Sequence, residues 1–396
     1  MVRIVLGVVW LTGLLFGEAA PELNNKYSDS AKCKPCHTEK VHEWSDSWHS
    51  KSHYNNNEYL RKSIDYVGRK SRKSKNAIKI ECAACHNPRI AVTKTGMDYE
   101  IMAAMKLDGG SAVNKALESD SLNEGINCLV CHSVDKIDEK ADETVRGTHR
   151  LHWNPVGIMS GPIDDAKSPY HKTQSRDFFK EESNKLCFVC HANDRSQSGL
   201  LFANMEKEMG DSEKLCADCH MSPKKPGVAS NLAIENNKPK KRMVREHGFV
   251  GAHTPSLWEG ALTLSVAKKG NELLVTINND NPHNLPSGFG ARELIIDATY
   301  KSGQKSIASK TVSMTQKYTS KRGKPTIPHL AVEATKDISI PANGSRTVKF
   351  PWVEGTGVVN VELYYRLVND EVHSILKLKE PIWSKKMFID KRVFRP

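Results

Sequence analysis

The feature that most constrains this chain is a short pattern, Cys-x-x-Cys-His, that occurs five times between Cys33 and His220. The cysteines of the five copies are Cys33 and Cys36, Cys82 and Cys85, Cys128 and Cys131, Cys187 and Cys190, and Cys216 and Cys219. The histidines that close the copies are His37, His86, His132, His191 and His220. The copies use all ten cysteines of the chain, so the same chemistry is repeated five times and no thiol remains for anything else.

This spacing is the attachment signature of c-type haem. Two thiols three positions apart reach the two vinyl groups on one edge of a porphyrin, and the next residue places an imidazole under the iron. A single copy is also compatible with a redox dithiol or half of a zinc site. A zinc or disulfide framework, however, gives no reason for a histidine after every second cysteine. We therefore predict five covalently bound haem c groups and a redox function.

The second axial position of each iron decides between electron transfer and catalysis, because two strong protein ligands leave no room for a substrate. Eight further histidines precede residue 254, namely His42, His49, His53, His149, His152, His171, His247 and His253. Five haems need at most five of them, so we predict mostly bis-histidine ligation. The expected distal ligands are His49, His53, His149, His171 and His247.

Several alternatives stay open among these distal candidates. His149 and His152 lie three residues apart, so only one of them is expected to bind an iron, and His247 competes with His253 in the same way. His49 and His53 are four residues apart on a predicted helix and would share one face. Met159 and Met221 are weaker alternative ligands.

Residues 1–19 resemble an export signal, with Arg3 before an apolar run and a small-residue cleavage site at Gly17-Glu18-Ala19. The run of about 13 apolar residues is shorter than the roughly 20 that span a bilayer. We therefore predict a periplasmic or otherwise extracytoplasmic protein without a stable membrane span. The formal charge of +12 could indicate a nucleic-acid partner. Five haems would bring about −5 to −10 through their propionates, so we predict no nucleic-acid binding.

The composition changes near residue 254. Residues 20–253 hold every motif and 13 of the 16 histidines, and they read as loops with helices expected at 40–51, 56–67, 99–107, 111–119 and 177–185. Residues 254–396 contain alternating strand-like runs at 261–266, 272–277, 293–300, 306–312, 335–340, 346–350 and 358–367. We predict an α+β chain: a helical and loop-rich multihaem domain, then an antiparallel, immunoglobulin-like β-sandwich with a tail that folds back on the first domain.

Short motifs around the haem sites resemble those of multihaem c-type cytochromes related to the tetrahaem electron carrier of hydroxylamine oxidoreductase. These are Trp44-x-x-Ser47-x-His49, Gly161-Pro162-x-x-Asp165 before His171, Cys219-His220-Met221-x-Pro223 and His247-x-Phe249-x-Gly251. The resemblance covers about residues 30–255 and implies that His49 is a distal ligand. Further on, His283-Asn284-Leu285-Pro286-Ser287-Gly288 with Arg292 resembles the start of a β-domain attached to many such proteins. We interpret it as a structural turn, or as an approach of His283 to a haem where the domains meet.

Two departures from related enzymes favour an electron carrier. Pentahaem nitrite reductases have one Cys-x-x-Cys-Lys motif at the catalytic haem, whereas all five motifs here end in histidine. No tyrosine is identified as the crosslinked residue of hydroxylamine oxidoreductase. We expect electrons to pass from a membrane quinol-oxidising cytochrome to a periplasmic or outer-membrane reductase. The alternatives are a reductase or oxidase of a small nitrogen or sulfur oxyanion at one open haem, and a subunit of a larger redox assembly.

Two basic segments are candidate docking surfaces for an acidic redox partner. Arg61–Lys79 carries eight lysines and arginines, and Lys224–Arg245 carries seven. The simpler interpretation of each, which we prefer, is an ordinary solvated loop.

Overall fold

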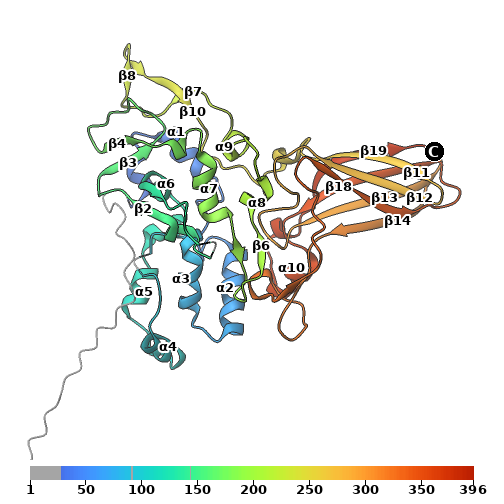
Figure 1. Ribbon diagram of the computed structural model, residues 1–396, viewed down its shortest axis with the longest axis horizontal. Helices are drawn as coiled ribbons and strands as arrows, with labels where there is room; N and C mark the ends of the chain where they lie inside the picture. The colour runs from blue at the N-terminus through green and yellow to red at the C-terminus, as the bar shows by residue number, and fades with distance from the viewer. Residues whose placement is uncertain (1–27, 91, 143) are drawn as a thin grey trace, which may run out of the picture.

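The computed structural model describes residues 28–90, 92–142 and 144–396, so the predicted export signal lies outside the described residues. The chain is α+β and has two parts (Figure 1). The motif-bearing part, residues 28–253, consists of helices and short strand pairs. The strand-rich part, residues 254–396, projects to one side of it. None of the helices in the described ranges combines the length and apolar character that crossing a membrane requires.

The elements of the motif-bearing part are short. Its α-helices are α1 (Thr38–Ser45), α2 (Glu58–Ser71), α3 (Lys75–His86), α4 (Met97–Ala104), α5 (Ala112–Leu117), α6 (Cys128–His132), α7 (Ser183–His191), α8 (Met205–Met209) and α9 (Cys216–His220). Its 3-10 turns are η2 (Ser30–Lys32), η3 (Asp120–Glu124), η4 (Gly147–Arg150) and η5 (Asp177–Phe179). Its strands are β1 (Val134–Ile137), β2 (Leu151–Trp153), β3 (Ile158–Gly161), β4 (Lys172–Ser175), β5 (Asp194–Arg195), β6 (Leu201–Ala203), β7 (Lys225–Val228), β8 (Ile234–Glu235), β9 (Lys238–Pro239) and β10 (Lys241–Val244). They pair as β1–β2, β3–β4, β5–β6, β7–β10 and β8–β9.

Four of the five motifs lie at the carboxyl end of a helix. α3, α6, α7 and α9 end at the histidines of motifs two to five, and α1 begins directly after His37. Side chains three positions apart share a helix face, so the two cysteines of each of these four motifs point the same way. Capping fixes where α3 starts, because the Ser74 hydroxyl accepts a hydrogen bond from the Ala77 N–H.

The strand-rich part contains two antiparallel sheets. Its strands are β11 (Thr263–Lys269), β12 (Glu272–Asn279), β13 (Glu293–Ser302), β14 (Lys305–Met314), β15 (Tyr318–Thr319), β16 (Glu333–Ala334), β17 (Gly344–Pro351), β18 (Val358–Arg366) and β19 (Met387–Phe394), with helices η6 (Pro255–Trp258), η7 (Pro328–Leu330), α10 (Asp370–Leu376) and η8 (Pro381–Trp383). One sheet has the order β11-β12-β17 and the other β14-β13-β18-β19, while β15 pairs with β16. Alternate residues of β12 and β18 are buried, as a sheet with one covered face requires. The two sheets share one apolar core. The immunoglobulin-like assignment stays a prediction.

Most of the long helices and strands lie where the sequence predicted them, but some of the predictions were wrong. Residues 335–340 do not form a strand, because their backbone joins the sheet only through the bridge between Ile340 and Leu285. The helix expected at 177–185 is split into η5 and α7. The last strand, β19, and the motif helices were missed.

The two parts are in close contact through α2. Leu60, Ile64 and Val67 of α2 belong to the same apolar cluster as the strand-rich core. The Glu58 carboxylate accepts hydrogen bonds from the backbone N–H groups of Lys379 and Glu380, at 3.0 and 2.9 Å. The segment after β18 therefore packs on the first part, as was predicted for the tail.

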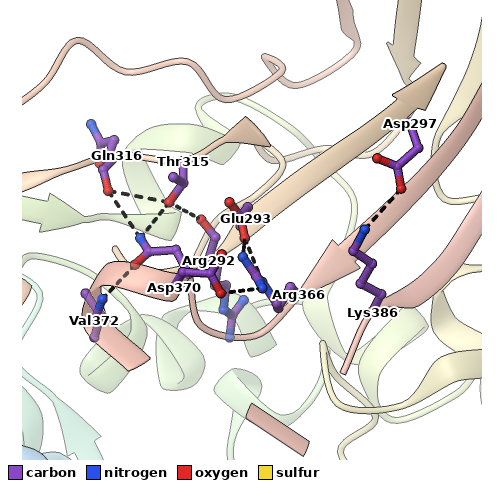
Figure 2. Close-up of polar contacts among 10 residues, drawn as sticks. Arg292, Glu293, Asp297, Thr315, Gln316, Arg366, Asp370, Val372 and Lys386 are labelled. Carbon is purple, nitrogen blue, oxygen red and sulfur yellow. Dashed lines mark hydrogen bonds and ion pairs between the residues drawn. The ribbon is translucent and has the colours of Figure 1, made fainter. Parts of the chain in front are cut away.

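A buried ion pair fixes this end of the strand-rich part (Figure 2). The Arg366 side chain is paired with Glu293, and both are nearly inaccessible, at 10% and 4% exposed. Arg366 also donates to Asp370 at 2.7 Å. Asn369 caps α10 by accepting from the Val372 N–H. Arg366 thereby connects the paired strands β13 and β18 to the first residue of α10.

Candidate haem centres

Four of the five motif histidines face a second histidine ring from elsewhere in the chain. The ring centres are 6.4 Å apart for His37 and His171, 6.3 Å for His191 and His49, 6.3 Å for His132 and His247, and 6.5 Å for His220 and His283. The planes of each pair are within 30° of parallel. Each pair joins residues that are distant in the sequence.

This spacing fits two imidazoles on opposite sides of one iron. An imidazole nitrogen binds a transition metal at about 2 Å and the ring centre lies about 1.1 Å behind it, so two such rings have centres about 6.2 Å apart. Direct stacking of aromatic rings also occurs at 4.5–7 Å, so distance alone does not decide. The orientation of the nitrogens adds a second test.

Hydrogen bonds at Nδ1 leave the other ring nitrogen available for a metal. Nδ1 of His37 donates to the Ala229 carbonyl at 2.6 Å, His132 to Ser160 at 2.7 Å and His220 to Val250 at 2.6 Å. A carbonyl oxygen only accepts, so the proton is on Nδ1 and Nε2 keeps its lone pair. Such bonds orient metal-binding histidines. The residues present therefore fit axial haem ligation at these motifs.

The Trp44-x-x-Ser47-x-His49 segment places His49 opposite His191. The Trp44 indole donates to the Ile126 carbonyl at 2.8 Å, and the Ile126 N–H donates to the His49 carbonyl at 3.0 Å. Gly125 packs against this turn with a φ of 59°, and a Cβ there would come within 2.7 Å of the His49 carbonyl oxygen. Burial, with smaller contributions from nearby histidines, lowers the pKa of His49 to about 3. The ring is therefore neutral, which is the ligating form.

One segment, residues 245–251, serves two motifs. His247 faces His132 of the third motif, and its backbone N–H donates to the Glu43 carboxylate at 2.9 Å. Val250 accepts from His220 of the fifth motif, while the Val250 N–H donates to the His220 carbonyl at 3.0 Å. Burial lowers the pKa of His247 to about 3, so this ring is neutral too.

The strand-rich part supplies the ring opposite His220. The buried Asn279 side chain donates to the carbonyls of His283 and Pro341, at 2.9 and 3.0 Å. Nδ1 of His283 donates to the Asn284 carbonyl at 2.9 Å. The arrangement favours the haem-approach interpretation of His283 over that of a plain structural turn.

Two expected distal ligands are not brought to a motif histidine. His149 is exposed on η4, as is its neighbour His152 on β2. His53 is buried, but its Nδ1 accepts from the Asn55 N–H at 3.1 Å, which leaves the proton on Nε2. His253, the alternative to His247, stacks on Trp48 at 4.7 Å. Spacing in sequence therefore did not separate ligands from other histidines in these cases.

The motifs lie close to one another. The thiols of Cys33 and Cys128 interact electrostatically, so motifs one and three are neighbours. Cys190 interacts in the same way with Cys85, and Cys187 with Cys216, so motif four is next to motifs two and five. Cys131 of motif three also lies near Cys187 and Cys190. All five motifs thus form one connected set.

The fold of the chain is similar to that of a solved multihaem cytochrome. One similar structure is a penta-heme cytochrome c552 from Thermochromatium tepidum, with a TM-score of 0.67 and 16% sequence identity over 93% of this chain and 98% of that one. An X-ray structure of a structural-genomics target has a TM-score of 0.13 and 11% identity over 34% of this chain and 86% of that one, too low to indicate a shared fold. No family model and no curated protein matches the chain.

Proposed function

We propose that this protein is an electron-transfer cytochrome with five covalently attached haems, at least four of which have two histidine ligands. The observation that carries the proposal is the set of four imidazole pairs with ring centres 6.3–6.5 Å apart. The pairs are His37 with His171, His132 with His247, His191 with His49, and His220 with His283. When bound, each haem supplies an iron that alternates between the ferric and ferrous states.

The chain's own residues hold and tune these centres. The motif cysteines would hold the porphyrins and the paired imidazoles would bind the irons, which would exclude substrates and keep the reduction potentials lower than methionine ligation would. Backbone carbonyls on Nδ1 make the motif imidazoles stronger donors to the metal. The contacts between motifs support a path for electrons that runs from motif one through motif three to motif four. From motif four the path branches to motifs two and five.

An acidic partner would fit the strand pair β7–β10, which lies beside motif one. Nδ1 of His37 donates to Ala229 just after β7, and the Asn231 N–H donates to the Cys36 carbonyl at 2.7 Å. The chain between β7 and β10 forms the strand pair β8–β9, so Lys238 of β9 and Lys241 of β10 are exposed near each other in sequence. Ile234 of β8 and Met243 of β10 are 57% and 55% exposed. We propose that this surface receives one redox partner. A membrane quinol-oxidising cytochrome as donor and a periplasmic or outer-membrane reductase as acceptor fit a protein exported by residues 1–19.

The direct test is the haem content of the exported protein. Intact mass spectrometry should give the processed polypeptide plus five haem masses that survive denaturation. Cys-to-Ala substitution of Cys128 and Cys131 together should remove one of the five. A product without covalent haem, or with the full number after that substitution, would end the proposal.

A second candidate, reduction of a small oxyanion at one haem, concerns the second motif. His86 is the motif histidine that no other histidine ring faces within the described ranges. Its Nδ1 lies 2.9 Å from the Ser52 hydroxyl instead of a carbonyl.

A further inference from the structure

The first of the two basic segments forms a helical hairpin, and not the solvated loop that its sequence favoured. Residues 61–79 comprise most of α2 and the start of α3. The tip of the hairpin, residues 69–75, contains no acidic side chain and five basic ones: Arg69, Lys70, Arg72, Lys73 and Lys75. All five are exposed. The tip is therefore a concentrated positive charge on the surface.

Only part of this charge is neutralised within the chain. Lys73 pairs with Glu81, and the Lys75 ammonium lies 3.6 Å from the Asp65 carboxylate. The other three cations of the tip, Arg69, Lys70 and Arg72, make no ion pair within residues 28–90, 92–142 and 144–396. These adjacent charges repel one another, and an anionic surface bound to them offsets that repulsion.

A hollow of about 380 Å³ opens at the tip between the two helices. It is lined by Asp65, Gly68, Arg69, Lys73 and Lys75. The Asp65 carboxylate is already engaged, because it accepts a hydrogen bond from the Tyr54 hydroxyl at 2.8 Å. The N–H groups of arginine and lysine are the usual donors to phosphate oxygens in proteins. The hollow therefore suits a phosphate group.

Next to the tip, α4 turns an apolar stripe to the solvent. Met97, Ile101 and Met105 recur every four residues and are 80%, 53% and 63% exposed. Residues four apart lie on the same face of a helix. Leu107, just beyond α4, is 63% exposed and extends the stripe. Large apolar side chains that gather on the surface of a folded protein mark an interaction site.

Contacts on the opposite face of α4 fix the stripe in place. Tyr99 is buried in a small apolar core, and its hydroxyl donates to the Asn114 side chain at 3.0 Å. The Glu100 carboxylate accepts from both the backbone N–H and the hydroxyl of Ser74, each at 2.8 Å. Ser74 is the N-cap of α3, so α4 is attached directly to the basic tip. The stripe and the tip therefore lie at one end of the molecule (Figure 1).

Apolar side chains beside a basic patch are the combination that binds the surface of an anionic bilayer. The apolar groups enter the boundary between headgroups and acyl chains, while lysine and arginine interact with the lipid phosphates. The charge alone would suit an acidic protein equally well. The apolar stripe favours a bilayer, because a bilayer offers an anionic layer and an apolar layer together.

We propose that the tip of the α2–α3 hairpin, together with α4, binds reversibly to an anionic membrane surface. This binding requires no helix that crosses the membrane, and it does not depend on the number of haems. Because α3 runs from the tip to the second motif, the bound protein has this motif on its membrane side. The β7–β10 pair, at the other end of the motif-bearing part, faces away from the membrane (Figure 1).

The first experiment measures co-sedimentation of the processed holoprotein with vesicles at low salt. Vesicles of equal parts phosphatidylglycerol and phosphatidylcholine should bind it at least about tenfold more tightly than pure phosphatidylcholine vesicles, and high salt should reduce this preference. Arg69→Gln with Lys70→Gln should weaken binding to the mixed vesicles at least about tenfold. Lys269→Gln with Lys305→Gln removes the same charge from exposed sites in the strand-rich part and should leave binding unchanged.

The second experiment tests the apolar stripe with the same mixed vesicles. Ile101→Ser with Met105→Ser should weaken binding about tenfold, because two apolar side chains no longer enter the bilayer. The matched control is Phe388→Ser with Val393→Ser, since both residues are exposed on β19, at 54% and 48%. This control should bind like the wild type.

Three results would overturn the inference. The first is equal binding to neutral and anionic vesicles, or binding to neither. The second is an equal loss of binding in a variant and its control. The third is slower electron exchange of the Arg69→Gln, Lys70→Gln variant with an acidic flavodoxin when the wild type binds no vesicles, which would assign the tip to an acidic protein. Haem content measured on the same samples tests the proposed function separately.

Discussion

At the residue scale, histidines that are close in sequence have different surroundings. His49 and His53 would share a helix face by spacing, yet only His49 meets a motif histidine, because the chain is in a turn there and not in a helix. The motif residues could be predicted because the signature for haem attachment has a fixed spacing. The rings opposite them could be predicted only in part: His49, His171 and His247 face motif histidines as expected. His53 and His149 do not, because tertiary contacts, such as that between Gly125 and the His49 turn, decide which rings meet.

His283 provides the sharpest residue-level prediction. His283→Ala should convert one low-spin haem into a high-spin haem, because the ring opposite His220 is removed. Electron paramagnetic resonance of the oxidised protein should show one more high-spin centre per molecule than the wild type. His253→Ala is the control, since that ring stacks on Trp48 and should leave the count unchanged. Identical spectra for His283→Ala and wild type would contradict the pairing.

The Arg366–Glu293 pair provides a stability prediction. Glu293→Gln removes the buried carboxylate that pairs with Arg366 and leaves only the exposed carboxylate of Asp370, so it should lower the free energy of unfolding by about 3 kcal/mol. Asp297→Asn is the matched control, because Asp297 pairs with Lys386 at the surface at 3.0 Å (Figure 2). It should cost less than about 1 kcal/mol. Thermal unfolding measures both, and equal losses would show that burial of the first pair is unimportant.

At the element scale, α2 is the connection between the two parts. A helix was predicted at 56–67, but its role was not, because that role depends on backbone N–H groups more than 300 residues later. Burial alone would raise the pKa of Glu58, but the N–H groups of Lys379 and Glu380 outweigh it, so the pKa is lowered. A carboxylate with a lowered folded pKa stabilises the fold above its unfolded pKa, and this stabilisation is lost as the pH falls through the folded value.

Glu58→Gln should therefore lower stability at pH 7 by about 2 kcal/mol, because it weakens charged hydrogen bonds. The difference from the wild type should shrink below the unfolded pKa, as the wild-type carboxylate becomes protonated. Chemical denaturation from pH 3 to pH 7 measures this. A difference that grows on acidification would contradict the sign.

The surface formed by the strand pairs β7–β10 and β8–β9 makes a kinetic prediction. Lys238→Glu with Lys241→Glu should slow electron exchange with an acidic flavodoxin about tenfold at low salt, and the effect should vanish at high salt. Lys269→Glu with Lys305→Glu makes the same change in net charge at exposed sites in the strand-rich part and should have little effect. Stopped-flow measurement at two salt concentrations compares the pairs, and equal slowing by both would mean that only net charge matters.

At the scale of the whole molecule, the strand-rich part contributes a ring to a candidate haem site, because His283 faces His220. The sequence predicted the change in composition near residue 254 and the α+β class, because strand alternation is a local signal. The approach of His283 to a motif was only one of two interpretations, because a loop such as 279–285 is placed by long-range contacts like those of Asn279.

The most direct test of the account is the ligation of every haem in the fully oxidised holoprotein, measured by near-infrared magnetic circular dichroism, which distinguishes histidine–histidine from histidine–methionine and high-spin iron. The account predicts at least four low-spin haems with two histidine ligands and at most one high-spin haem. Two or more high-spin haems, or a dominant histidine–methionine signal, would contradict it.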